Sequence, residues 1–178
     1  VNGLLATNQT CAGAVGKLSP AIEKIVKEYG LSVIGAEHCN SEKEREKAVL
    51  TLAKKKIPVH ADTDKKAAFD RIPAEKELFL ENPNNIDSLA KVRNMLIMTN
   101  TRNFTDKDLW VKALGDTNYD LLIIEPFFKS NIPLTKEEVK EIQAKKIGAR
   151  RLVFAVLNVA VAEDTRLYWE HGWKLRDP

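Results

Sequence analysis

Two hydrophobic periods alternate along the chain, one typical of strands and the other of helices. Six short apolar runs predict strands, at Gly3–Thr7, Leu31–Ala36, Ile57–Ala61, Asn94–Thr99, Tyr119–Ile124 and Leu152–Leu157. Between these runs, apolar residues recur at helical spacing behind residues that begin helices well. The predicted helices start behind Ser19, Ser41, Thr105 and Thr135 and end at Gly30, Lys56, Gly115 and Gly148, and a short further helix is predicted over Glu163–His171.

This alternation predicts an α/β fold of parallel β/α repeats with right-handed crossovers. Two architectures fit: a TIM-barrel-like arrangement, incomplete at about six strands, and an open doubly wound sheet. The chain has 178 residues, whereas a complete barrel usually needs about 200 or more. No glycine-rich phosphate loop follows any strand, so nucleotide-binding versions of the open sheet lose support. We expect one domain over residues 1–178, with an internal linker over 74–92.

Composition and charge exclude several classes of protein. Hydrophobic residues make up 44% and charged residues 30%, which is ordinary for a globular domain. The net charge of +3 is spread evenly, and the densest basic run, Lys54–Lys56, ends a predicted helix, so we expect no nucleic-acid partner. No apolar run approaches the roughly 20 residues of a membrane span.

The chain contains two cysteines, Cys11 and Cys39, without the paired spacing of a structural zinc site. They indicate either one disulfide in an oxidising compartment or two partly buried thiols. Asn8 and Asn103 begin glycosylation-type triplets, which accord with secretion. We expect no metal and no cofactor.

Polar residues follow the predicted strands and, in either architecture, meet at one rim where ligands bind. The first polar residues after the apolar runs are Asn8, Glu37-His38, Asp62, Asn100, Glu125 and Asn158, with Glu163-Asp164 shortly beyond the sixth strand. They predict an acidic, amide-lined cleft, in which Glu37, Asn100 and Asn158 bind substrate. The alternative is that these residues only mark the ends of strands.

Glu125 stands between the apolar stretches 121–124 and 126–128, so it is a candidate for general acid–base catalysis, or else a cap for backbone N–H groups. A second dense segment holds Glu163, Asp164, Arg166 and Trp169. Carboxylates, a guanidinium and aromatic faces are typical of carbohydrate sites. The same residues could instead form a helix with an inward aromatic face and surface ion pairs.

Several segments in order, at 118–125, 134–139, 148–153 and 162–169, resemble the endo-alpha-1,4-polygalactosaminidase-like family (glycoside hydrolase family 114 and related extracellular polysaccharide hydrolases). The resemblance covers roughly residues 94–178. Glu37–Cys39 and 65–73 resemble late-barrel elements of the same family less closely, which indicates a truncated or permuted relative. The resemblance implies an extracellular or cell-surface glycosidase with a TIM-barrel fold and a polysaccharide substrate containing amino sugars.

The resemblance assigns the paired carboxylates of such an enzyme to Glu125 and Glu163, with Asp164 and Arg166 positioning hydroxyls and Trp169 stacking on a sugar ring. Glu125 replaces the family's aspartate, and Ala160-Val161 replaces a glycine and a glutamate. If that missing acid is essential, a second hypothesis applies: a non-catalytic carbohydrate-binding or self-assembling module on a degenerate barrel, associating through open sheet edges.

Overall fold

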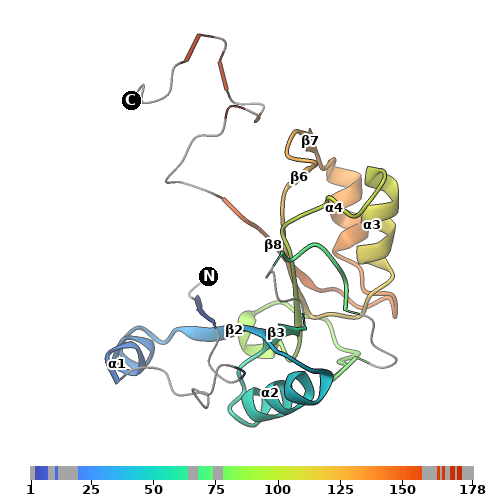
Figure 1. The fold of residues 1–178 in the computed structure, drawn as a ribbon. Coiled ribbons are helices and arrows are strands. Elements are labelled where there is room, and N and C mark those ends of the chain that lie inside the picture. The colour runs from blue at the N-terminus through green and yellow to red at the C-terminus, as the bar shows by residue number, and fades with distance from the viewer. Residues whose placement is uncertain are drawn as a thin grey trace.

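The protein is described by a computed structural model that covers residues 3–7, 11, 20–63, 68–73, 78–157, 164, 166, 169–170 and 172–173 (Figure 1). The elements in chain order are β1 (Gly3–Thr7), α1 (Pro20–Tyr29), β2 (Ser32–His38), α2 (Glu42–Lys54), β3 (Val59–Asp62), η1 (Leu89–Lys91), β4 (Met95–Met98), α3 (Lys107–Gly115), β5 (Leu121–Ile124), β6 (Phe127–Phe128), β7 (Ile132–Pro133), α4 (Lys136–Ile142) and β8 (Leu152–Ala155). The predicted α/β class is confirmed.

Six of the strands form two parallel three-stranded sheets, ordered β1-β2-β3 and β4-β5-β8. Each new strand is added on the same side as the one before it, so the strand order never reverses within either sheet. Among the described residues, β3 contacts β4 without joining the two sheets into one ladder, and β1 and β8 each pair on one side only. The described strands therefore do not close into a barrel. A small antiparallel hairpin, β6-β7, follows β5.

Alternating side chains of the strands supply separate apolar cores. One core lies between the two sheets and joins Ile34 of β2 to Ile97 of β4 and Leu121 of β5. The outer face of β4-β5-β8 carries the second core, where Trp110 and Ile142 belong to α3 and α4. Figure 1 shows these two helices side by side along that sheet. Both faces of β5 are therefore covered, as is usual for a parallel strand that consists of a continuous apolar run.

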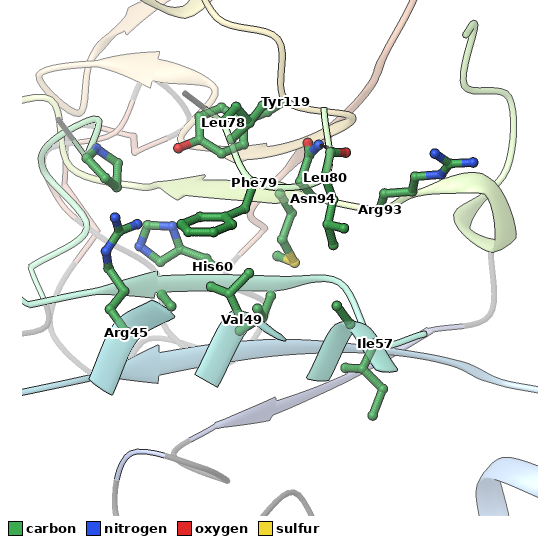
Figure 2. Close-up of a pocket in the computed structure, with 15 residues that line it drawn as sticks. Arg45, Val49, Ile57, His60, Leu78, Phe79, Leu80, Arg93, Asn94 and Tyr119 are labelled. Carbon is green, nitrogen blue, oxygen red and sulfur yellow. Dashed lines mark hydrogen bonds between the residues drawn. The ribbon is translucent and has the colours of Figure 1, made fainter. Parts of the chain in front are cut away.

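A third core packs α2 on the outer face of β3, through Leu52 and Val59 among others. Phe79 packs against this same core, and residues 78–80 line a small hollow near β3 and β4, which are not hydrogen-bonded to each other. Figure 2 shows Arg45 rising from α2 toward His60 and Phe79, with Leu78 beside Tyr119 across a small hollow. Apolar side chains thus join the two sheets at this point in place of a strand ladder.

Some predicted boundaries are confirmed and others are wrong. Thr135 and Glu138 form the predicted capping box, and Gly30 adopts the positive φ (59°) that ends α1. The N-cap of α3 is Asp106 rather than Thr105, because the Asp106 carboxylate accepts the Leu109 N–H at 2.8 Å. The β6-β7 hairpin was not predicted, since its strands are two residues each.

The helix predicted to run from Thr135 to Gly148 ends at Ile142. The reason is Lys145, whose buried ammonium donates to Asp120 at 2.6 Å and to the carbonyls of Asn82 (2.7 Å) and Asn84 (3.0 Å). The chain must leave the helix to deliver this side chain. The same bonds fix the polar stretch 81–85, the most turn-rich part of the expected linker, against β5.

Part of the helix predicted over 163–171 lies outside the described residues. Those of its residues that the structure describes, at 164, 166, 169 and 170, are not helical. Trp169 donates its backbone N–H to the Arg166 carbonyl at 3.0 Å, which forms a turn.

Candidate functional site

A cleft lies beyond the carboxyl ends of β4, β5 and β8. Its lining comes from residues 68–69, 99–102, Glu125, 129–130, Val156 and Arg166. Each segment directly follows a strand or reaches over the end of one, as parallel topology requires of residues that meet at a single rim. This is where the sequence placed the ligand-binding edge.

Glu125 and Arg166 form an ion pair in this cleft with two hydrogen bonds. Arg166 donates from Nη1 to Glu125 Oε1 at 2.5 Å and from Nη2 to Oε2 at 3.3 Å. Both side chains are about 13% exposed, so the pair is largely shielded from water. Such a fork-to-carboxylate arrangement fixes the orientation of both groups. The guanidinium also lies over the Phe127 ring, 5.3 Å from its centroid.

The loop after β4 forms a second wall. The Asn100 side-chain oxygen accepts the Arg102 backbone N–H at 3.1 Å, which makes a tight polar turn. The Arg102 side chain then reaches Asp70, whose Oδ2 accepts its Nε at 2.6 Å. Asp70 is 2% exposed and its Oδ1 has no hydrogen-bond partner. A buried carboxylate therefore holds the inner edge of a guanidinium whose outer edge faces the cleft.

The third wall is the β6-β7 turn. Lys129 and Ser130 both have positive φ, 47° and 70°, which is uncommon for residues other than glycine. The turn is held in place because Thr101 Oγ1 accepts the Lys129 N–H at 2.8 Å, and the Ser130 carbonyl accepts from Arg166 at 3.4 Å. A type I′ hairpin turn requires positive φ at both central residues, so this geometry follows from the tight turn that pairs β6 with β7.

A separate polar cluster lies where β2 and β3 end. The Asp62 carboxylate contacts His38 Nδ1 at 2.9 Å and His60 Nε2 at 3.3 Å. The Phe69 ring lies 5.3 Å from His38 and 5.6 Å from His60, centroid to centroid, and also lines the cleft. Phe69 therefore connects this His-Asp-His cluster to the cleft wall.

Cys11 and Cys39 are joined in a disulfide, with their Cα atoms 5.1 Å apart. Of the two states that the sequence left open, the structure has the bonded one. The bond attaches residue 11 to the end of β2, and the Cys11 N–H donates to Glu37 at 3.2 Å.

The structure brings some predicted site residues together and separates others. Glu125, Arg166 and Asn100 all line the cleft. Glu37 is fully buried and does not line it. Trp169 forms an edge-to-face pair with Trp173, their ring centroids 5.5 Å apart, and Asp164 is exposed. Glu163 and Asn158, as well as Asn8, lie outside the described residues.

Sequence reasoning did not assign Asp70, Arg102 or Lys129 to the site, whereas His38 was expected at the rim beside Glu37. Asp70 and Arg102 are 32 residues apart in sequence and are not part of any sequence motif that predicts their contact. Asp62 was predicted to follow a strand but is the last residue of β3, and its contacts with His38 and His60 become evident only from the pairing of β2 with β3.

No group of three or more His, Cys, Asp or Glu side chains in the described part of the chain is arranged to hold a metal ion. None of the described helices is both long and apolar enough to cross a bilayer. Comparison of the chain with protein-family models, with curated proteins and with solved structures finds no match.

Proposed function

We propose that this chain is an extracellular glycoside hydrolase that acts on a polysaccharide containing amino sugars. One observation carries the proposal. The ion pair joins Glu125, the acid after β5, to Arg166, which comes from the second part of the chain with carbohydrate-site chemistry, and both side chains line one cleft. They are separated by 41 residues, so only the fold can bring them together.

The sheet topology supports a TIM-barrel-like scaffold, incomplete in the described residues. Strands that follow each other without reversal, and a cleft at their carboxyl ends, are features of β/α barrels. A doubly wound sheet reverses its strand order at the ligand site. The disulfide supports an extracellular location, because such bonds persist in oxidising compartments.

The hydrogen bonds of Glu125 support one catalytic role over the other. Both of its oxygens accept from a guanidinium, so in this arrangement the carboxylate is a base or nucleophile rather than the proton donor. Under the proposal, Glu163 is then the acid that protonates the leaving oxygen. Asn100 and Arg166 position hydroxyl groups, and the exposed face of Trp173 beside Trp169 offers a surface for a sugar ring.

The test is hydrolysis of a fully N-acetylated α-1,4-galactosamine polymer, followed by the release of reducing ends. Glu125→Gln preserves shape and removes the charge, so we expect turnover to fall by about 10²–10⁴-fold. Glu141→Gln, on the exposed side of α4, is the matched control and should retain full activity. Turnover that is unchanged in Glu125→Gln rejects the role of Glu125.

The second candidate is a carbohydrate-binding or self-assembling module without catalysis. It is favoured by the complete engagement of Glu125 with Arg166, which leaves that carboxylate less open to attack a sugar, and by the open edges of β1 and β8. This candidate predicts that the wild-type chain binds the polymer but releases no reducing ends. It also predicts self-association, which solution scattering measures.

A further inference from the structure

Asn100 and Arg102 leave hydrogen-bond donors unused in the cleft. Asn100 uses its carbonyl oxygen on the Arg102 N–H, and its amide NH₂ makes no hydrogen bond to any described residue. Arg102 gives Nε and one Nη2 hydrogen to Asp70. An arginine carries five N–H groups in a planar fork, so three of them remain for a ligand.

The carboxylate and carbonyl acceptors near these donors are either bonded to Arg166 or buried. Both oxygens of Glu125 and the Ser130 carbonyl accept from Arg166. Asp70 is buried behind Arg102. The ligand that such a lining complements is therefore an acceptor rather than a donor.

The net positive charge of the cleft lining also favours an anionic ligand. Three cationic side chains line or border the cleft, from Arg102, Lys129 and Arg166, against the carboxylates of Glu125 and Asp70. The Arg102 side chain is 56% exposed although its inner edge is fixed. A guanidinium held in this way is preorganised, because little side-chain freedom remains to be lost when a ligand binds.

We propose that Arg102 and Asn100 form a subsite for the carboxylate of an acidic sugar, so that the cleft takes a polysaccharide with uronic acid units. A planar carboxylate matches the free side of the Arg102 fork and can also accept from the Asn100 amide. The proposal rests on the proposed function only in using the same cleft. The subsite also restricts which polysaccharides the cleft can bind. Because the three cations repel free amino groups, any amino sugar bound here is N-acetylated.

The experiment measures binding by calorimetry with two probes that share one sugar backbone, trigalacturonate and its fully methyl-esterified form, in which each carboxylate charge is replaced by a neutral methyl ester. With the wild-type chain we expect the acid to bind at least about tenfold more tightly than the ester, as for a charge-assisted pair. This comparison requires no variant, so it is independent of any effect on folding. Equal binding of the acid and the ester, or binding of neither, overturns the proposal.

The Arg102→Gln variant, checked for its folded circular dichroism, assigns the effect to this residue. We expect trigalacturonate to fall to the affinity of the ester while binding of the ester stays unchanged. Lys112→Gln, a charge removal on the exposed surface of α3, is the control and should bind as the wild type does. A variant at Arg102 that keeps the preference for the acid overturns the assignment.

The two proposals fail separately. If the acid binds preferentially but no polymer is cleaved, the hydrolase proposal fails and the subsite remains. If a polymer is cleaved while acid and ester bind alike, the subsite fails and the hydrolase proposal remains.

Discussion

Arg166 holds Glu125 by both carboxylate oxygens, at 2.5 and 3.3 Å, although 41 residues separate the two in sequence. The same guanidinium contacts the β6-β7 turn through the Ser130 carbonyl and lies over Phe127. Arg166 therefore sets the position of Glu125 relative to two walls of the cleft. If Glu125 is the base or nucleophile, Arg166 is its positioning residue.

The first prediction concerns Arg166→Lys. Lysine keeps the charge but cannot donate two parallel hydrogen bonds to one carboxylate. We expect polymer hydrolysis to fall by about 10²-fold, as for a misplacement of about 1 Å. Most of the loss should be in kcat rather than KM, which steady-state kinetics separates. A change confined to KM would show that Arg166 only binds substrate.

The second prediction concerns the buried pair of Lys145 and Asp120, both fully buried. Lys145→Met removes the cation and leaves the Asp120 carboxylate uncompensated, at a cost of about 3–5 kcal/mol in the free energy of unfolding. Denaturant titration measures this loss. The neighbouring Lys146→Met, at an exposed position, is the control.

Adding Asp120→Asn to Lys145→Met removes the unpaired charge and should recover part of that stability. A double variant that is no more stable than Lys145→Met would mean that the ammonium contributes mainly by holding the carbonyls of Asn82 and Asn84.

The third prediction is for the disulfide between Cys11 and Cys39, which closes a loop spanning 28 residues. On the loop-entropy estimate, its removal lowers the free energy of unfolding by about 3–4 kcal/mol. Unfolding curves with and without reductant measure the difference. The double variant with alanine at both positions should match the reduced protein and be insensitive to reductant, and any residual sensitivity contradicts the assignment.

The fourth prediction is a pH dependence at the start of α4. Burial raises the pKa of Glu138, but hydrogen bonds from Lys107 and the Thr135 N–H outweigh it and lower the pKa below its ordinary value of 4.5. Because the folded-state pKa is the lower one, this stabilisation is present above pH 4.5 and is lost as the pH falls through the folded-state value.

Glu138→Gln keeps the capping side chain and removes only the charge. We expect it to cost a few tenths of a kcal/mol, up to about 1 kcal/mol, at pH 7. The difference from the wild type should shrink when unfolding is followed toward pH 3, and a difference independent of pH would contradict the ion pair.

The sequence predicted the elements of the fold better than their junctions. The six parallel strands are found because apolar runs report burial directly, as for Leu121 and Leu122, which are fully buried. The predicted end of α4 was wrong, because the helix ends where Lys145 must reach Asp120. These two residues are 25 positions apart in sequence. Hydrophobic periodicity carries no information about such a contact.

The residues of the candidate site likewise fall into those that the sequence predicted and those that only the structure shows. Glu125 and Asn100 were identified because they directly follow strands whose direction is known once the sheet is parallel. Asp70 and Arg102 were not, because they come from an irregular segment and a loop that meet only in three dimensions. Glu37 was predicted by the same strand-end rule as Glu125, but β2 continues to His38, so Glu37 lies within the strand, accepts the Cys11 N–H and is buried away from the cleft.

The most direct measurement is the distance between the carboxyl groups of Glu125 and Glu163 in an experimental structure with a bound oligosaccharide. If the two acids form a catalytic pair, we expect their carboxyl groups to flank the bound sugar. Their separation should be about 5–5.5 Å in a retaining enzyme or about 6.5–9.5 Å in an inverting one. Carboxyl groups that face different surfaces of the molecule would contradict paired-carboxylate catalysis in this cleft.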